Sequence, residues 1–287
     1  MPTVSDQPVR RDRYDRCPGV LRPWPADDGL LVRLRLIGGQ VSAATLTSLV
    51  SVAETFGDGR VHATSRANLQ VRAFPGEGGH VEARALAALE TTGLLPSRTH
   101  ELVRNVMTSP QTGLAGGRID LRPVSDELDR LICADPTLAR LPGKFLFVLD
   151  DGRGDLLGQA CDLGIVALDE RSGQLRVGSG WGMVIPLDET ASVLAGLAGR
   201  FVDHRGEGPS APWHVDELAA PMIDPSEPDP RLPTVGGPLP YGVVPGGTHI
   251  EVPESGLDAR AIQNLAEAAR QLVVTPWRGI LIPNTEQ

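Results

Sequence analysis

The strongest constraint on the fold is a strand signature that this 287-residue chain contains twice. The stretch "TSRANLQVR" runs over 64–72, and "TPWRGILIP" runs over 275–283. Each copy begins with Thr and ends in an apolar-x-apolar pattern, and the offset between them is 275 − 64 = 211 residues. We therefore expect two related structural units, one near each end of the chain.

The segments around the two copies predict the same order of elements. In the first unit, an alternation of apolar residues and Arg over 29–39 predicts a strand, and a helix over 42–56 follows. In the second unit, a strand over 247–252 precedes a helix over 257–272, with Asp258 as a possible N-cap. One unit alone cannot bury its sheet, so we expect the two to pair. The predicted fold is α+β, with two ferredoxin-like half-units forming one pseudo-symmetric domain.

The stretch between the repeats mixes helical and strand patterns and predicts a central α/β domain. A helix is expected to start at Ser125 as its N-cap, and a segment dense in Pro resembles a linker. The expected organisation is an irregular arm (1–25), half-unit 1 (26–76), the central α/β domain (77–223), the linker (224–240) and half-unit 2 (241–287).

Charge, hydropathy and cysteine content argue against three classes of protein: nucleic-acid binders, membrane proteins and proteins that ligate an iron–sulfur cluster with their own cysteines. The net charge is −9 and no basic stripe is evident, which argues against a nucleic-acid partner. No apolar run reaches the length of a membrane span, and no secretory signal is evident, so we expect no membrane association and a cytoplasmic location. Three widely spaced cysteines, Cys17, Cys133 and Cys161, are fewer than the four thiolates that an iron–sulfur cluster normally takes.

Basic and amide side chains recur on the predicted strands of half-unit 1. Arg33 and Arg35 are two residues apart, so they share a strand face that suits carboxylates, or is simply solvated. Four more polar residues follow the same period of two: Arg66, Asn68, Gln70 and Arg72. One face of that strand would then suit a large polyanionic ligand, unless it is the solvent face of an edge strand.

Lys144 is the single lysine among 27 Lys and Arg residues. In a chain that otherwise uses Arg, a lone compact ammonium can mark a place where a planar guanidinium will not serve. The alternative is the chance survival of one surface lysine.

Several motifs together resemble the sirohaem-type nitrite and sulfite reductases. These motifs are "VRLRLIGG", "TSRANLQVR", "RNV" and "LPGKF", and they occur in that order. Within that superfamily, "CPGVL", "DDG" and "TPWRG" look most like the precorrin-3B synthase branch. The resemblance implies an oxidoreductase of cobalamin biosynthesis, which uses oxygen to hydroxylate and lactonise the polycarboxylate tetrapyrrole precorrin-3A.

The resemblance also implies roles for single residues. Three catalytic residues would surround the bound anion: Arg35, Arg104 and Lys144. Five residues would contact the tetrapyrrole: Thr64, Arg66, Asn68, Gln70 and Asn105. Leu146 stands where the reductases have a second Lys, which argues against a sulfite site.

The cofactors implied by the resemblance are a tetrapyrrole, as substrate or as sirohaem, and a [4Fe-4S] cluster. The cluster cysteines of the family, C-x₅-C and C-x₃-C, are absent from this sequence. We therefore expect a cluster-bearing partner chain or another electron donor. Three hypotheses remain open: an oxidoreductase that is incomplete without a cluster-bearing module, a non-catalytic tetrapyrrole-binding module or inactive paralogue, and a fragment of a nitrite or sulfite reductase.

Overall fold

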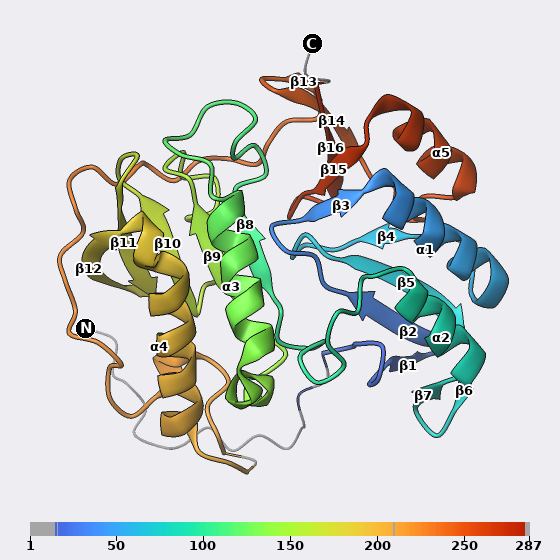
Figure 1. Cartoon of the computed structure of the whole chain (residues 1–287), viewed down its shortest axis with the longest axis horizontal. Helices are drawn as coiled ribbons and strands as arrows, with labels where there is room; N and C mark the ends of the chain where they lie inside the picture. Colours follow the sequence, from blue (N-terminus) through green and yellow to red (C-terminus); the bar gives the residue numbers. More distant parts are fainter. Residues whose placement is uncertain (1–14, 16, 209, 285–287) are drawn as a thin grey trace.

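The computed structural model describes residues 15, 17–208 and 210–284. They form an α+β structure of two lobes. One lobe is built from the two ends of the chain, and the other from its middle (Figure 1).

The first unit is an antiparallel sheet of order β1-β2-β5-β4, covered by one helix. Ser42 starts that helix, because its side chain accepts a hydrogen bond from the N–H of Thr45. The elements are β1 (Trp24–Ala26), β2 (Gly29–Leu34), β3 (Gln40–Ser42), α1 (Ala43–Phe56), β4 (His62–Ala63) and β5 (Leu69–Phe74), followed by the small hairpin β6 (Gly76–Glu77) and β7 (His80–Val81) and by α2 (Ala83–Thr91).

The second unit has the same strand order, β13-β14-β16-β15. Asp258 caps its helix by accepting from the N–H of Ala261, as the sequence predicted. The elements are β13 (Gly242–Val244), β14 (Gly247–Glu251), α5 (Ala259–Ala268), β15 (Gln271–Val274) and β16 (Gly279–Pro283).

The two units exchange the segment that precedes each helix. Val41 in β3 pairs antiparallel with Leu272 in β15, so the first unit extends the second sheet. In return, Val61 and Leu257 exchange backbone hydrogen bonds of 2.9 and 2.8 Å. The result is two linked sheets rather than one closed sheet, and α1 and α5 pack over a shared aliphatic core.

The repeated Thr motif forms the same turn in both units. In 64–68 and in 275–279, the N–H of the first residue donates to the carbonyl of the fifth at 2.9 Å. The hydroxyl of that Thr accepts from the N–H of the fifth residue at 3.2 Å in both copies. The fourth residues, Ala67 and Arg278, both have positive φ. The Thr therefore recurs because its hydroxyl closes the turn.

This turn corrects one expectation. Arg66 lies in the turn, ahead of β5, so the face predicted to carry Arg66, Asn68, Gln70 and Arg72 is not continuous. Only Gln70 and Arg72 belong to the strand, because the positive φ of Ala67 interrupts the alternation.

The central lobe is a five-stranded sheet of order β12-β11-β10-β9-β8. Strands β8, β9 and β10 are parallel, β11 and β12 are antiparallel additions, and α3 and α4 lie on one face (Figure 1). The elements are β8 (Val106–Thr108), α3 (Arg122–Ala134), η1 (Pro136–Arg140), β9 (Phe147–Asp150), β10 (Leu163–Ala167), β11 (Ser172–Val177), β12 (Gly180–Pro186), η2 (Leu187–Glu189), α4 (Thr190–Arg205) and η3 (Val215–Glu217).

The predicted cap of α3 is wrong. The helix begins at Arg122, and Ser125 is buried within it, with its hydroxyl donating to the carbonyl of Arg122 at 2.8 Å. Pro123 in the first turn explains the earlier start, because a helix's first turn needs no donor from that residue.

A Gly-Gly turn joins the lobes. Gly38 donates to the carbonyl of Val106 at 2.9 Å, at the edge of the central sheet. Gly39 has a φ of 73°, and a Cβ at this position would lie 2.1 Å from the carbonyl oxygen of Val274. Only glycine fits at position 39. The turn can therefore contact the central lobe through Gly38 and the second unit through Gly39.

Two connecting segments are more ordered than the sequence indicated. Most of the predicted N-terminal arm falls outside the described residues, but Cys17 to Val20 are buried, and the carboxylate of Glu101 accepts from the N–H of Leu21 at 2.8 Å. The predicted linker over 224–240 has no helix or strand, yet Gly236 donates to the carbonyl of Gly154 at 2.8 Å.

Among the described residues, no helix has the length and apolar character needed to cross a membrane.

Candidate functional site

A groove lies between the two units, over the face of the first sheet. We call it the cationic groove. It encloses about 230 Å³, and its charged lining consists of Arg33, Arg72, Arg278 and Glu254. Thr64 and Gln70, two of the predicted tetrapyrrole contacts, also line it. Arg72 is paired with Asp28 at 3.1 and 3.3 Å. With Glu254 also counted, the guanidinium groups exceed the carboxylates by one, so the groove has a small local excess of positive charge in an acidic chain.

Arg33 lines this groove and is largely held by the protein. Its Nη2 donates to Oε1 of Gln70 at 3.2 Å, but its buried Nε has no hydrogen-bond partner among the described residues. Burial lowers the pKa of Arg33. A buried guanidinium N–H without a partner is costly. This Nε is closed off from solvent, so a ligand would pair with it only after the side chain moves.

A second pocket adjoins the groove and contains the predicted Lys144. This Lys144 pocket of about 280 Å³ is lined in part by Arg66, Leu146, Asp162 and Trp213. Arg66 Nη1 donates to the carbonyl of Lys144 at 2.9 Å, which links the first unit to the central lobe. The ammonium of Lys144 lies 5.3 Å from the centre of the Trp213 ring, a distance typical of a cation–π contact.

Two carboxylates, Asp162 and Glu217, line the Lys144 pocket opposite its two cations, and Asp162 is the more deeply buried. Its carboxylate accepts from the N–H of Leu146 at 2.9 Å and of Val215 at 3.2 Å, and lies 3.7 Å from Nε2 of His214. Burial raises the pKa of Asp162 to about 6. Sequence reasoning did not place Asp162, His214 or Trp213 at the site, because only the fold brings them close to Lys144.

Arg35 is buried and lines neither of these cavities, because its guanidinium joins neighbouring segments of the chain. Its Nε donates to Oδ1 of Asn105 at 2.9 Å, and its Nη1 to the carbonyl of Pro18 at 3.3 Å. Asn105 in turn donates to the carbonyls of Leu102 and Gly143, each at 3.0 Å. Burial lowers the pKa of Arg35 to about 10, so it stays cationic at neutral pH.

Arg104 and Asn68 are also bound within the protein. Arg104 forms a forked ion pair with Asp129, at 2.6 and 2.8 Å, which offsets its charge. Arg104 and Arg35 line a separate cavity of about 190 Å³. Asn68 is buried, and its Oδ1 accepts from the N–H of Leu36 at 2.9 Å. Six of the eight predicted residues thus line one of three cavities. The other two, Asn68 and Asn105, are buried and hydrogen-bond to neighbouring segments.

A [4Fe-4S] cluster does not fit the residues of this chain. Cys17 lies in the N-terminal segment, Cys133 on α3 and Cys161 before β10, and all are free thiols. No group of three His, Cys, Asp or Glu side chains among the described residues is arranged to hold a metal ion. The pKa of Cys17 is raised by burial and by Asp15, so this thiol is not activated.

Comparison with known proteins relates the chain to one family and one fold. Residues 25–77 match the nitrite/sulfite reductase ferredoxin-like half domain. A precorrin-3B synthase from Sinorhizobium sp. is 28% identical over 197 residues, which cover 66% of this chain and 39% of that protein. The structure of the Mycobacterium tuberculosis NirA protein has a similar fold, with a TM-score of 0.63 and 20% identity over 96% of this chain and 57% of that one.

The chain thus spans less than two thirds of the length of either protein. It is a distant homologue of precorrin-3B synthase that contains a nitrite/sulfite reductase ferredoxin-like half domain and has a NirA-like fold.

Proposed function

We propose that this distant homologue of precorrin-3B synthase binds a polycarboxylate tetrapyrrole in the cationic groove, as the substrate-binding part of an oxygen-dependent oxidoreductase. The observation that carries the proposal is that three arginines from the two units, Arg33, Arg72 and Arg278, line one groove. Carboxylates on the rim of a macrocycle are suitable partners for guanidinium groups.

The scaffold of this site is the pair of end units. We infer that they form one pseudo-symmetric domain of two ferredoxin-like half-units. The shared strand order, the reciprocal exchange of Val41 and Leu257, and the two identical Thr turns support this inference. The groove lies between the units because Arg33 comes from one of them and Arg278 from the other.

The macrocycle would extend from the groove into the Lys144 pocket. Thr64 lines the groove and Arg66 lines the pocket, so the Thr turn forms the border between the two cavities. Each cavity alone is small for a tetrapyrrole, and the pair offers cations on both sides of that border. Arg33, Arg72 and Arg278 would hold carboxylates on one side, and Arg66 and Lys144 on the other.

The supporting residues would orient the cations. Arg35 holds Asn105 and the carbonyl of Pro18, while Arg104 is fixed on Asp129. Both would act as positioning residues for the strand and loop that carry Arg33 and Lys144. Sirohaem, if it is the occupant, would supply a redox-active iron, and the same arginines would hold its carboxylates.

A monooxygenase reaction needs electrons from outside this chain. One oxygen atom enters the tetrapyrrole and the other leaves as water, which consumes two electrons and two protons for each O₂. The cysteines present do not fit a cluster. We propose that a cluster-bearing partner chain or another electron donor supplies the electrons.

A non-catalytic tetrapyrrole-binding module is the second candidate, and the unsuitable cysteine arrangement favours it. Oxygen consumption separates the two. Precorrin-3A, the chain and a reduced iron–sulfur donor protein are combined in an oxygen electrode, and a trace without the chain serves as the control. The enzyme proposal expects consumption that depends on both precorrin-3A and the chain. A flat trace with substrate demonstrably bound would leave only the binding module.

A further inference from the structure

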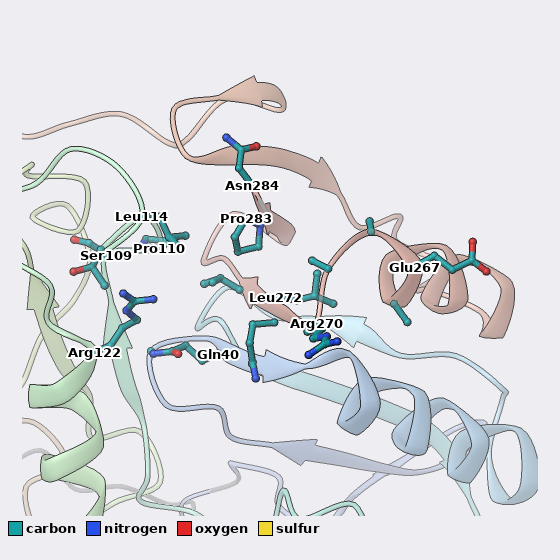
Figure 2. Close-up of a pocket in the computed structure, with 17 residues that line it drawn as sticks. Gln40, Ser109, Pro110, Leu114, Arg122, Glu267, Arg270, Leu272, Pro283 and Asn284 are labelled. Carbon is teal, nitrogen blue, oxygen red and sulfur yellow. The ribbon is translucent and has the colours of Figure 1, made fainter. Parts of the chain in front are cut away.

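A cavity larger than the cationic groove shares no lining residue with it. It encloses about 720 Å³ between the second unit and the central lobe, and we call it the second-unit pocket (Figure 2). Its walls are the end of α5 with β15, the loop 109–114, and the segment after the Gly-Gly turn. This volume is in the range of small-molecule sites.

The linings of the second-unit pocket and of the cationic groove share some equivalent positions of the repeat. Arg33 pairs across the sheet with Gln70, and His249 pairs with Leu281 in the same way. With the offset of 211 residues, Arg72 corresponds to 72 + 211 = 283, which is Pro283. Arg72 lines the groove and Pro283 lines the pocket, so one place in the repeat forms both cavities.

The repeat has lost its cations at this place. The equivalents of Gln70 and Arg72 are Leu281 and Pro283, and of these only Pro283 lines the pocket. The equivalent of Arg33 is His249, which does not line the pocket and is fully buried. Its Nδ1 lies 3.1 Å from the carbonyl of Leu239, and its Nε2 lies 3.0 Å from the hydroxyl of Thr275. A polycarboxylate would therefore find far fewer partners here than in the groove.

The remaining lining is amphipathic. Apolar side chains form part of the wall, among them Leu114 and Pro283 (Figure 2), whereas Leu272 is 1% exposed and packs into the core. Arg122 also faces the cavity, but its charge is offset by Asp120 at 2.7 Å. Arg270 is exposed, and its guanidinium forms no hydrogen bond or ion pair within the described part of the chain.

The carboxylate of Glu267 does not cancel the charge of Arg270. Its Oε1 accepts a hydrogen bond from Gln263, one turn earlier on α5. In Figure 2 it is directed away from the other labelled lining residues. The pocket therefore offers one available cation beside an apolar wall.

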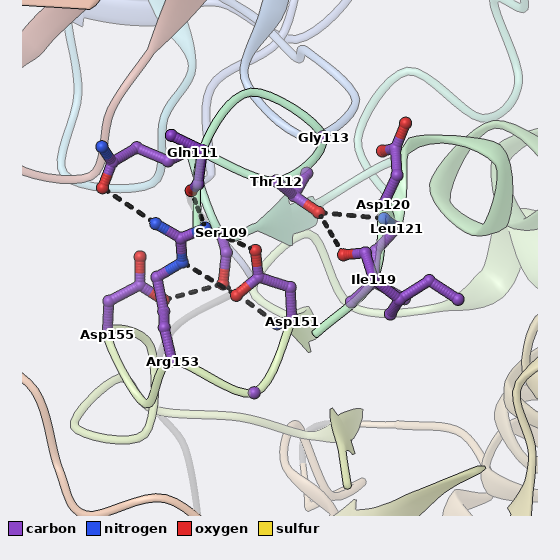
Figure 3. Close-up of polar contacts among 12 residues, drawn as sticks. Ser109, Gln111, Thr112, Gly113, Ile119, Asp120, Leu121, Asp151, Arg153 and Asp155 are labelled. Carbon is purple, nitrogen blue, oxygen red and sulfur yellow. Dashed lines mark hydrogen bonds and ion pairs between the residues drawn. The ribbon is translucent and has the colours of Figure 1, made fainter. Parts of the chain in front are cut away.

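The wall contributed by the central lobe is held in place. Ser109 donates to Asp155 at 2.7 Å, and Arg153 bridges Asp151 and Gln111 (Figure 3). Gln111 Nε2 in turn donates to the carbonyl of Pro245 in the second unit at 2.6 Å. These bonds fix the loop against the second unit, so the cavity is preformed.

We propose that the second-unit pocket binds a small amphipathic organic anion, with a flat apolar body against Leu114 and Pro283 and a single anionic group on Arg270. This site is separate from the tetrapyrrole site, and it differs from it in ligand class although the two arise from the same repeat.

Two fluorescent probes of similar shape test the proposal on the full chain. The first, 8-anilinonaphthalene-1-sulfonate, carries one negative charge, and the second, N-phenyl-1-naphthylamine, carries none. Ala268→Trp places a bulky ring at the exposed mouth of the pocket, and Asn264→Trp is its control on the outer part of α5. Arg270→Glu reverses the cation, and Arg260→Glu is its control.

We expect saturable binding of both probes at one site. Ala268→Trp should weaken both by about tenfold or more, whereas Arg270→Glu should weaken the anionic probe about tenfold and the neutral probe little. Both control variants should bind like the unmodified chain. The proposal is overturned if both pocket variants, with unchanged thermal unfolding, keep the affinity for the anionic probe, or if Arg270→Glu affects the two probes equally.

A tetrapyrrole titration keeps this result distinct from the proposed function. Uroporphyrin, a polycarboxylate tetrapyrrole, should bind Ala268→Trp as it binds the unmodified chain. Displacement of the anionic probe by uroporphyrin would show that the two ligands share a site and would contradict the proposal.

Discussion

Ala67 and Arg278 have the same left-handed backbone conformation, with φ of 54° and 56°, at positions 278 − 67 = 211 residues apart. Each is the fourth residue of a Thr turn that leads into a central strand of its unit. Non-glycine residues rarely adopt this conformation, so the repeat preserves a strained turn at both places.

A β-branched residue at Arg278 should destabilise the fold. Arg278 is exposed, so Arg278→Val changes little packing but places a branched Cβ at positive φ. We expect the free energy of unfolding to fall by about 2 kcal/mol, and Arg278→Gly to leave it within about 1 kcal/mol. Urea unfolding of the two variants measures this difference. Equal stabilities would show that the turn is not strained.

The ion pair between Arg104 and Asp129 should stabilise the protein. The side chains are 8% and 19% exposed, so Asp129→Asn leaves a largely buried guanidinium without its counter-charge. We expect a loss of about 2–4 kcal/mol. Glu127→Gln, which breaks the exposed pair with Arg130 on the same helix, should cost less than about 0.5 kcal/mol. Comparable losses in the two variants would contradict this account of Arg104.

Asp155 should make stability depend on pH. Burial, and then the charge of Asp150, raise its pKa from 3.8 to about 7. The folded state then holds a proton that the unfolded state releases, so this contribution is complete below about pH 4 and is lost as the pH rises through 7.

Asp155→Asn should remove that part of the pH dependence, since an amide can still accept from Ser109. Denaturant unfolding between about pH 4 and pH 8 measures the slope, and Asp203→Asn on the surface of α4 is the control. Asp162, with a pKa raised to about 6, leaves a residual slope of the same sign. An unchanged slope in Asp155→Asn would show that its carboxyl is ionised in the folded protein.

Arg66 and Lys144 should each contribute to tetrapyrrole affinity. Removal of one charge-assisted contact, by Arg66→Ala or Lys144→Ala, should cost about 1.5–3 kcal/mol of binding free energy. Arg130→Ala, on an exposed part of α3, is the matched control. Fluorescence titration with uroporphyrin measures the affinities. If folded Arg66→Ala and Lys144→Ala bind as tightly as the control, the tetrapyrrole does not reach the Lys144 pocket.

The sequence predicted what depends on local pattern. Asp258 was identified as a cap, and the offset of 211 residues located two units with one strand order, because turn chemistry and alternation are local. The position of Arg66 could not be predicted, since nothing in its neighbours indicates the positive φ of Ala67.

The sequence also could not predict which side chains contact Lys144 and Arg104. Trp213 follows Lys144 by 213 − 144 = 69 residues, and Asp129 is separated from Arg104 by β8, a loop and the first part of α3. Such pairs arise from the packing of the central lobe, and no spacing rule links them. For the same reason, the sequence does not predict the second-unit pocket, whose walls come from the loop 109–114 and from the second unit.

The central claim is that the cationic groove binds a polycarboxylate tetrapyrrole, and Arg33 tests it most directly. Uroporphyrin is titrated against the unmodified chain and Arg33→Met, at low and at high salt. We predict saturable binding that weakens as salt increases, and at least about tenfold weaker binding for Arg33→Met with a smaller salt effect. Equal affinity of the two folded proteins at both salt concentrations would contradict the claim.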